Sequence, residues 1–455
     1  MILEGKKVLV LGAARSGVAA AKVLKQAGAD VVVTDSASEE KLINDLKELQ
    51  DIGVPLMSGG HPSDLLNMGF DLLVKNPGIP PSIPFLQQIR EVGIPIISEI
   101  ELAYQVNKGQ MIGITGSNGK TTTTTWLGEM LQADRPKVRV AGNIGIPLSL
   151  EAANCDEDDW LVVELSSFQL NDVIDFRVRS AAILNLSEAH LDWHGGFDEY
   201  YKAKSNLMRQ QQSQDYAILN ADNQPSLSMA EFTKGKVWTF SRRSVVEQGA
   251  YLDGEVIRLV LPELGIAEEL VAVSDLGIGY AHNVENAMAA TLLALSVGAK
   301  LENIRPVLHS FKGLAHRFQI VAEKQGRLFI NDSKATNPGA SEIAMTLPGV
   351  PVVLIAGGLE RHIDLMPFAK QIKKYCRGVA LIGQTKERLA RDLTAIGFTN
   401  FRLAADMAEA VPLAFELSQA GDTILLSTGC ASWDMYSNYD VRGDDFIANV
   451  AKIPE

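Results

Sequence analysis

The chain has 455 residues, 46% of them hydrophobic and 21% charged, and its formal net charge is −13. Such a length predicts about three domains, and the acidic balance argues against a nucleic-acid-binding protein, which would need a basic face. The three cysteines, Cys155, Cys376 and Cys430, lie too far apart in the sequence for a paired metal-binding motif. We therefore expect a reducing, cytoplasmic location, and no apolar run approaches the roughly 18 residues that a membrane-spanning helix needs.

The first 98 residues predict one domain in which strands and helices alternate. An apolar strand at residues 7–11 stops at Gly12, so the start of the chain does not resemble a signal peptide. A Gly-rich turn and an Ala-rich helix follow, and the second strand leads into Asp35. The turn lacks the middle glycine of a dinucleotide-binding fingerprint. A uridine-type or dinucleotide ligand and a purely structural turn therefore both remain open.

A second tight turn follows the third strand of this domain. The strand at residues 71–75 runs directly into Asn76, Pro77 and Gly78. Open α/β sheets bind ligands at the carboxyl ends of their strands, which makes this turn a candidate ligand contact. Prolines then interrupt the chain, and the segment 94–98 completes the domain.

Residues 99–313 are expected to form a central domain built around a phosphate-binding loop. An apolar strand leads into Gly116-Ser-Asn-Gly-Lys-Thr-Thr122 and then into a helix. Backbone N–H groups in such a turn and at the helix start favour an anion, Lys120 adds a positive charge, and the hydroxyl of Thr121 can ligate Mg²⁺. The usual spacing would place a glycine at position 114, where this chain has Ile114. The loop is therefore a variant, and a merely structural Gly-rich turn is the alternative.

Two further side chains are expected on the same edge as this loop. Glu164 ends an apolar strand, and His190 lies shortly after the next one. A carboxylate at that edge can hold Mg²⁺, but Glu164 could also be a solvated strand end and His190 a structural histidine. Taken alone, Lys202 and Lys204 predict ordinary surface charges.

The last part of the chain, residues 314–455, predicts a third domain. Apolar strands that end in small or polar residues and precede helical segments lie at 328–330, 352–355, 379–382 and 423–426. This repeated pattern is typical of doubly wound topology. The cluster of Asp332, Lys334 and Thr336 is denser in functional groups than a turn requires.

Together these patterns predict an α/β protein of three domains, at residues 1–98, 99–313 and 314–455. Each domain is expected to hold a mostly parallel sheet with helices on both faces. The first and third domains would be Rossmann-like, and the central one would resemble a P-loop ATPase.

Six motifs, in this order and spacing, resemble those of the Mur ligases and together cover essentially the whole chain. They are Thr115–Thr122 (TGSNGKTT), Glu164–Gln169 (ELSSFQ), His190–Asp192 (HLD), His282–Asn286 (HNVEN), Gly313–Arg317 (GLAHR) and Asn331–Asn337 (NDSKATN). The resemblance implies an ADP-forming amide ligase that uses ATP and Mg²⁺ and adds D-glutamate to UDP-N-acetylmuramoyl-L-alanine in peptidoglycan synthesis. ATP would phosphorylate the acceptor carboxylate, and the amine of D-glutamate would then displace the phosphate.

The resemblance also implies which residues form the site. The catalytic residues would be Lys120, Glu164, His190 and Lys204, and Mg²⁺ would be held by Thr121, Glu164, His190 and a carbamylated Lys204. ATP would contact Gly116, Ser117, Asn118, Gly119, Lys120, Thr121, Thr122, Asn286, Arg317 and Asp332. The UDP-linked acceptor would contact Arg15, Ser16, Asp35, Ser36, Asn76, Gly78, Asn143, Ser166 and Gln169. D-glutamate would contact Lys334, Thr336, Arg361, Ser432 and Tyr439.

The chain departs from the family pattern at several of these places. Ser117 stands where threonine is frequent, and Ser427-Thr428-Gly429 stands where Ser-Pro-Ala is usual. Arg361 and Tyr439 occupy positions that hold lysine and phenylalanine in some members. Because a guanidinium is not equivalent to an ammonium at a carboxylate, the amino-acid contacts are where this chain differs most from the pattern.

Three other functions fit the sequence less well. A sister Mur ligase that adds another amino acid is the nearest, but the Asp-Asn-Pro-Arg stretch of the diamino-acid-adding type is absent, and Asn118 stands where the alanine-adding type has histidine. A dinucleotide-dependent oxidoreductase would leave the phosphate loop and the third domain without a role. A non-catalytic nucleotide-binding regulator would not need Lys120, Glu164, His190 and Lys204 together. We expect a monomer without nucleic-acid or membrane partners.

Overall fold

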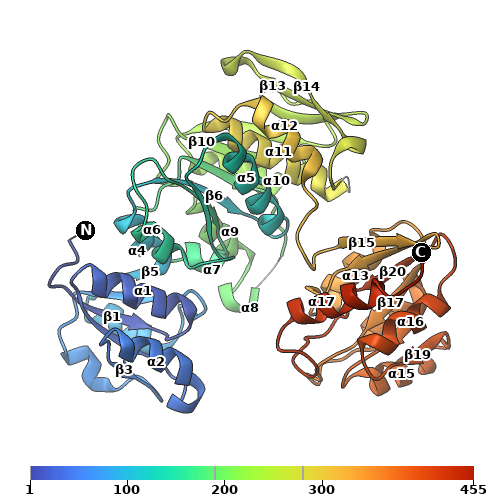
Figure 1. Ribbon diagram of the computed structural model, residues 1–455. Helices are drawn as coiled ribbons and strands as arrows, with labels where there is room; N and C mark the ends of the chain where they lie inside the picture. Colours follow the sequence, from blue (N-terminus) through green and yellow to red (C-terminus); the bar gives the residue numbers. More distant parts are fainter. Residues whose placement is uncertain (1, 189–190, 279–280) are drawn as a thin grey trace. The chain divides into compact units, whose positions relative to one another are not determined.

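The computed structural model describes residues 2–188, 191–278 and 281–455. The chain divides into two compact units, unit 1 at residues 1–311 and unit 2 at residues 312–455 (Figure 1). Unit 1 contains two β-sheets and unit 2 contains one. Among the described residues, no helix is both long enough and apolar enough to cross a membrane.

The first sheet of unit 1 has five parallel strands in the order β3-β2-β1-β4-β5. Successive residues of β1 point to opposite faces of the sheet, so Val8 and Val10 join one buried cluster while Leu9 and Leu11 join another. Helices therefore cover both faces, as a parallel sheet requires. The strands are β1 (Lys7–Leu11), β2 (Asp30–Thr34), β3 (Leu56–Met57), β4 (Leu72–Lys75) and β5 (Ile96–Ser98). The helical segments are α1 (Arg15–Gln26), η1 (Glu39–Leu42), α2 (Ile43–Asp51), η2 (Ser63–Asn67), α3 (Pro84–Glu91) and α4 (Glu99–Val106).

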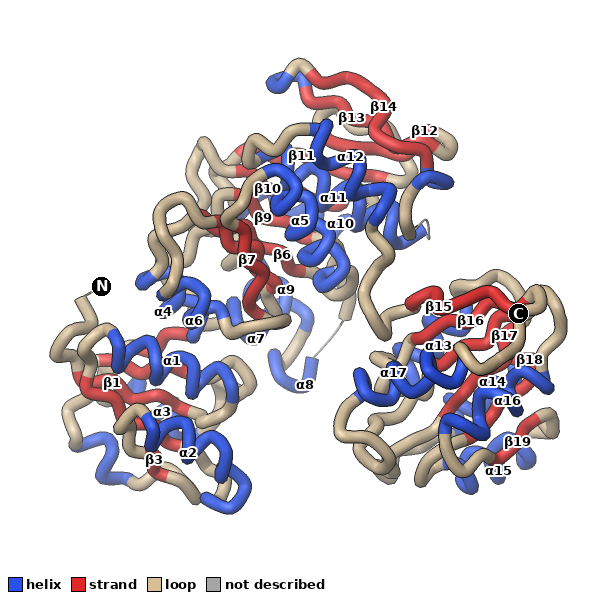
Figure 2. The backbone as a smooth tube through the Cα atoms, viewed as in Figure 1, coloured by secondary structure: helices blue, strands red, loops and turns tan. Residues whose placement is uncertain are grey.

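The second sheet of unit 1, the central sheet, has nine strands in the order β14-β13-β12-β11-β10-β9-β6-β8-β7. The strands from β7 across to β12 run parallel, and β13 and β14 are antiparallel additions at one edge (Figure 2). Its core again splits by face, with Ile112 and Ile114 in one buried cluster and Met111 in the other. The strands are β6 (Gln110–Thr115), β7 (Val138–Gly142), β8 (Trp160–Glu164), β9 (Ser180–Ile183), β10 (Tyr216–Asn220), β11 (Lys236–Ser241), β12 (Gly249–Asp253), β13 (Val256–Leu261) and β14 (Ile266–Ala272).

The helices of the central sheet include two that pack together on one side, α5 and α11, both adjoining the same buried cluster. The α-helices are α5 (Lys120–Asp134), α6 (Leu148–Ala153), α7 (Ser167–Leu170), α8 (Leu191–His194), α9 (Phe197–Ser205), α10 (Gln224–Leu227), α11 (Ala281–Ser296) and α12 (Leu301–Ser310). The short 3-10 segments are η3 (Ser228–Phe232), η4 (Pro262–Leu264) and η5 (Val273–Asp275).

Unit 2 holds a six-stranded sheet in the order β15-β16-β20-β17-β18-β19. Only the first pair, β15 with β16, is antiparallel. Buried clusters lie on both faces here too, one with Leu354 and the other with Val353 and Ile355. The strands are β15 (Gln319–Lys324), β16 (Arg327–Asn331), β17 (Val352–Ala356), β18 (Cys376–Leu381), β19 (Phe401–Leu403) and β20 (Thr423–Leu426), and the helices are α13 (Pro338–Thr346), α14 (Met366–Tyr375), α15 (Lys386–Ala395), α16 (Met407–Leu417) and α17 (Tyr439–Val450).

The predicted fold class is confirmed: three mostly parallel sheets, each covered by helices on both faces, follow one another along the chain. The limits predicted for the three domains stay a prediction, because the first two sheets belong to one compact unit. The antiparallel edge of the central sheet was not predicted. Its outer strand β14 has three consecutive exposed residues, so it lacks the continuous apolar run that marked the inner strands.

Candidate functional site

The phosphate-binding loop joins the carboxyl end of β6 to the start of α5. Gly119 has a left-handed φ of 84°, and a Cβ atom there would collide with the side-chain amide of Asn286, so the position requires glycine. The Lys120 Nζ atom donates to the carbonyl oxygens of Gly116 at 2.9 Å and Ser117 at 3.1 Å, which draws the lysine back over the loop. The first turn of α5 carries no acidic residue. The N–H groups at the start of α5 and the positive charge of the lysine together favour an anion.

Lys204, on α9, is buried beside this loop with only 2% of its surface exposed. Its Nζ atom donates to the Thr115 hydroxyl at 2.9 Å and to the Gly116 carbonyl at 3.1 Å, both neutral oxygens. Burial lowers the pKa of Lys204 well below its ordinary value; the nearby charge of Lys120 lowers it further, and Glu164 opposes the shift. The expectation from residue type alone, an ordinary surface charge, is therefore wrong for Lys204.

Glu164, the last residue of β8, is 1% exposed. Its Oε1 atom accepts a hydrogen bond from the Asn143 amide at 2.8 Å. Its Oε2 atom is buried and has no hydrogen-bond partner among the described residues. A buried carboxylate oxygen in that state is costly unless a cation or a water completes it. The alternative of a solvated strand end is wrong for this residue.

The expected Mg²⁺ site can be compared with these groups only in part. His190 lies outside the described residues. Within the described ranges, no three or more His, Cys, Asp or Glu side chains gather in a way that could hold a metal ion. The unpartnered Glu164 oxygen and the Thr121 hydroxyl are nevertheless hard oxygen donors of the kind that Mg²⁺ prefers, and Mg²⁺ keeps several waters of its own. The donors present therefore fit a partly hydrated Mg²⁺.

Tyr200 contacts the loop as well, although residue type alone gave it no role. Its hydroxyl lies 2.8 Å from the Ser117 Oγ atom, and its ring centroid lies 4.9 Å from the Lys204 Nζ atom. Burial raises the pKa of Tyr200, so its hydroxyl keeps its proton. The four-residue spacing between Tyr200 and Lys204 was the available signal, because side chains four apart lie on the same face of a helix.

A cavity of about 640 Å³ lies at the carboxyl edge of the first sheet, and it gathers four predicted acceptor contacts, Asp35, Ser36, Asn76 and Gly78. The Asp35 carboxylate accepts backbone N–H bonds from Ala13 at 2.7 Å and Ala37 at 2.8 Å, which ties it into the first turn. Two aromatic side chains that the sequence did not single out complete the wall. His61 stacks on Phe85 with ring centroids 4.6 Å apart, and burial lowers the pKa of His61, which favours a neutral ring.

A smaller cavity of about 230 Å³ lies between the first and central sheets of unit 1. One wall comes from the first sheet and the other from the central sheet, and the lining includes Arg15, Ser16, Asn76, Gly78, Asn143, Ser166 and Gln169. Ser166 and Gln169 also form a capping box at the start of α7, so their polar groups orient that short helix. All nine predicted acceptor contacts thus line one or other of these two cavities.

In unit 2, two residues predicted to contact D-glutamate meet. The Lys334 Nζ atom donates to the Tyr439 hydroxyl at 2.7 Å and lies 4.2 Å from the centre of its ring. The turn before Lys334 is held by Arg442, which is 1% exposed and donates to the hydroxyl and carbonyl of Ser333 and to the carbonyl of Cys430. Arg442 was not predicted, and nothing in its local sequence marks it as buried.

The other predicted residues of unit 2 are more dispersed. Arg361 is exposed and its guanidinium lies 5.4 Å from the centre of the Trp433 ring, next to the buried Ser432. Asp332 accepts hydrogen bonds from the Ser427 hydroxyl at 2.8 Å and the Phe318 backbone N–H at 3.2 Å. Burial raises the pKa of Asp332 to about 7, against the lowering effect of those hydrogen bonds and of Arg317. The ligand contacts assigned to these residues stay predictions.

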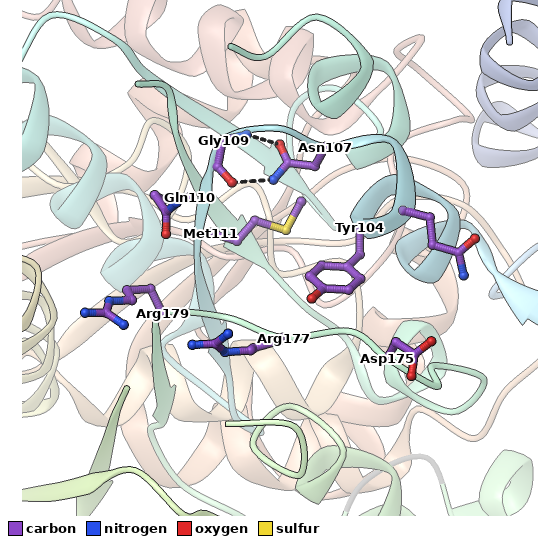
Figure 3. A pocket seen from close by; sticks show the side chains of 9 residues that line it. Tyr104, Asn107, Gly109, Gln110, Met111, Asp175, Arg177 and Arg179 are labelled. Atoms are coloured by element: carbon purple, nitrogen blue, oxygen red, sulfur yellow. Dashed lines mark hydrogen bonds between the residues drawn. The ribbon is translucent and has the colours of Figure 1, made fainter. Parts of the chain in front are cut away.

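The opposite edge of the central sheet has a cavity of its own, of about 730 Å³, lined by Tyr104, Asn107, Gln110, Asp175, Arg177 and Arg179 among others (Figure 3). Arg177 forms two hydrogen bonds to Asp215, at 2.7 and 3.0 Å, and Arg179 adds a third at 3.1 Å. The Asp215 side chain is fully buried. Nothing in the sequence analysis pointed to this edge.

Three family models match the chain in succession. The Mur ligase MurD-like N-terminal domain matches residues 6–98, the Mur ligase middle domain matches residues 114–294, and the Mur ligase glutamate ligase domain matches residues 316–430.

Whole-length relatives agree with these matches. The chain is 43% identical to the UDP-N-acetylmuramoylalanine–D-glutamate ligase of Geobacillus kaustophilus, over 99% of this chain and 98% of that protein. It is 44% identical to the protein of the same name from Enterococcus hirae, over 98% and 96%.

Solved structures with the same architecture are more distant. The UDP-N-acetylmuramate–alanine ligase MurC of Thermotoga maritima matches with a TM-score of 0.56 at 20% identity, over 98% of this chain and 99% of that one. MurF of Acinetobacter baumannii matches with a TM-score of 0.58 at 18% identity, over 97% and 93%. At such identities the likeness concerns the fold alone.

Proposed function

This chain belongs to the Mur ligase family, and from that premise we propose that it is the ATP-dependent, ADP-forming ligase that joins D-glutamate to UDP-N-acetylmuramoyl-L-alanine in peptidoglycan synthesis. Support for the amino acid comes from the relatives of that name, which match over nearly the whole chain. The observation that carries the chemistry is the buried Lys204 amine beside the phosphate loop, with neutral hydrogen-bond partners and a lowered pKa.

The reaction has two steps. The γ-phosphoryl group passes from ATP to the carboxylate of the alanyl acceptor, which gives an acyl phosphate and ADP. The amine of D-glutamate then attacks the acyl carbon, loses a proton and expels phosphate, leaving the new amide. Phosphoryl transfer needs positioning and charge neutralisation more than covalent help. The loop from Gly116 to Thr122 would supply both, because the N–H groups at the start of α5 and the positive charge of Lys120 favour an anion there.

Mg²⁺ bound here would neutralise charge on the phosphates. The residues proposed to hold it are Thr121, Glu164, His190 and Lys204, the last as a carbamate. Glu164 fits this role because one of its buried oxygens lacks a partner among the described residues. Lys204 fits it because a neutral amine can add CO₂ and release a proton, which turns the buried amine into an oxygen-bearing anion.

The remaining contacts are proposed from the lining of the two cavities and from unit 2. The uridine end of the acceptor occupies the larger cavity of the first sheet, where Asp35 and Ser36 lie, and its sugar and alanyl part pass Asn143, Ser166 and Gln169. Asn286, Arg317 and Asp332 serve the adenosine side. Lys334, Thr336, Arg361, Ser432 and Tyr439 receive the carboxylates of D-glutamate, for which cationic side chains are suited. We place the enzyme in the cytoplasm as a monomer.

The test offers the protein ATP, Mg²⁺ and UDP-N-acetylmuramoyl-L-alanine together with one amino acid at a time. ADP should form with D-glutamate, and little should form with L-glutamate, D-alanine or meso-diaminopimelate. Preferential turnover with a different amino acid would make the protein a sister ligase. No ADP with any of them, in the presence of intact folded protein, would remove the ligase proposal.

A further inference from the structure

A buried ion pair links the two sheets of unit 1. Lys75 is the last residue of β4 and is fully buried, and its Nζ atom lies 2.9 Å from the Asp172 Oδ2 atom. Asp172 follows α7 of the central sheet, and its own side chain is 12% exposed. The Asp172 backbone carbonyl also accepts the N–H of Ser98 at 2.8 Å, so this residue meets the first sheet through side chain and backbone.

Stability alone is a weak reason for such a pair. Removing a lysine from water is costly, and burial lowers the pKa of Lys75 while the Asp172 carboxylate opposes that shift. Two apolar side chains of similar size would often hold buried surfaces together equally well. What a buried ion pair adds is specificity, because a buried charge is stable only where its partner lies close to it.

The two residues of the ion pair lie close in sequence to the two walls of the smaller cavity. Lys75 directly precedes Asn76, which lines one wall of the 230 Å³ cavity together with Gly78. Asp172 lies three residues after Gln169, which lines the facing wall. The Lys75 Nζ atom also donates to the Ile79 carbonyl at 2.8 Å, which closes the turn that carries the first wall. One ammonium group therefore fixes both the shape of that turn and its distance from the opposite wall.

We propose that Lys75 and Asp172 are positioning residues that set the width of the cleft between the first and central sheets, and so align the acceptor carboxylate with the phosphate loop. This inference rests on the proposed function, since it takes the cleft to hold the UDP-linked acceptor. Neither residue touches the reacting atoms. Their effect passes through the turn at Asn76 and through the segment that follows α7.

The experiment is a double-mutant cycle of Lys75→Met, Asp172→Asn and the double variant. Each single variant should raise the KM for the acceptor about tenfold, equivalent to ~1.4 kcal/mol, with the KM for ATP changed by less than about twofold. The double variant should be no worse than the worse single one, because both break the same interaction. Lys6→Met is the matched control, since Lys6 pairs with Asp71 on the exposed surface of the same sheet and should leave both KM values unchanged.

A second variant at Lys75 and measurements of stability can contradict the inference. Lys75→Arg keeps the charge but changes the geometry, so it should fold normally and still raise the KM for the acceptor; thermal unfolding checks each variant. An unchanged acceptor KM with a lowered melting temperature would reduce the pair to packing and overturn the inference, as would equal rises in both KM values. If the wild type shows no D-glutamate-dependent turnover, the proposed function fails instead, and calorimetric binding of the acceptor still tests the pair.

Discussion

Positive side chains lie at both edges of the central sheet, but their hydrogen-bond partners differ. At the amino edge, Arg177 and Arg179 share the buried carboxylate of Asp215, and the hydrogen bonds to it raise the pKa of Arg177. At the carboxyl edge, Lys204 is held by a hydroxyl and a carbonyl oxygen, and its pKa falls. A charge that is balanced inside the protein is part of the structure, whereas one that is left unbalanced needs a partner from outside.

Cavity size alone would have favoured the amino edge, where we propose no active site. A cavity of about 730 Å³ lies at the amino edge and is lined by both arginines (Figure 3), whereas the cavity beside Asn143 and Ser166 measures about 230 Å³. The edge that we propose as functional is instead marked by two groups whose burial is costly: the Lys204 amine, which donates to neutral oxygens, and a Glu164 carboxylate oxygen without a donor among the described residues. Perturbed groups of this kind are concentrated at functional sites. The predictions that follow test whether the two edges differ as this contrast requires.

The largest effect is expected from Lys120→Ala at the carboxyl edge. Loss of the cation that faces the phosphates should lower the rate of phosphate release about a thousandfold, while circular dichroism and thermal unfolding stay close to wild type. Lys202→Ala is the control, because Lys202 is an exposed lysine on α9, the helix that carries Lys204, and its nearest acidic partner in that helix, Glu199, lies 3.9 Å away. Normal turnover by Lys120→Ala would show that the loop does not bind the phosphates of ATP. The proposed difference between the two edges of the sheet would then fail as well.

A smaller loss, about a hundredfold in kcat, is expected from Lys204→Ala, because the proposed carbamate oxygens would be gone. Short carboxylic acids such as acetate should restore part of the rate, since they supply an oxygen anion to the space the lysine leaves. The same acids should not rescue Lys120→Ala, where the missing group is a cation. Full activity of Lys204→Ala without added acid would refute the carbamate.

At the amino edge, a substitution should lower stability without lowering activity. Asp215→Asn leaves two guanidinium groups without their shared counter-ion, which should lower the free energy of unfolding by about 2 kcal/mol; the partial exposure of the arginines limits the loss. The KM values and kcat should remain those of the wild type. Asp156→Asn, at an exposed carboxylate 4.0 Å from Lys137, is the control for a surface pair. Lost activity with retained stability would mean that this edge, too, is functional.

A pH-dependent effect on stability, smaller per pH unit than the loss in Asp215→Asn, is expected from Asp332 in unit 2, where burial raises the pKa from 3.8 to about 7. The folded state then holds this proton more tightly than the unfolded state. Its contribution to stability is complete below about pH 4 and is lost as the pH rises through 7. Between pH 5 and 7 the free energy of unfolding of the wild type should fall by about 1 kcal/mol per pH unit relative to that of Asp332→Asn. Urea unfolding at pH 5, 6, 7 and 8 measures this, and parallel pH profiles of the two proteins would contradict it.

The sequence was informative where the chemistry is local. The phosphate loop could be located because Gly119 and Lys120 are neighbours and lie between a strand and a helix, so their roles depend on a backbone conformation that a few residues determine. The order of strands and helices was readable for the same reason, since apolar runs and the turns after them recur along the chain. Tyr200 and His61 received no role of their own because they act on groups, Ser117 and Phe85, that lie far from them in the sequence.

By itself, the sequence determined a three-sheet α/β fold and, through its motifs, the family, and it predicted a phosphate-binding loop. Only the tertiary structure decided which charged residues are buried and what balances them: Lys204 with neutral oxygens, Lys75 with Asp172, and Arg177 with Asp215. A lysine or arginine on a helix or strand has the same local preferences whether it faces water or the core. Its pKa and its role depend on the segments that fold over it, and those come from distant parts of the chain.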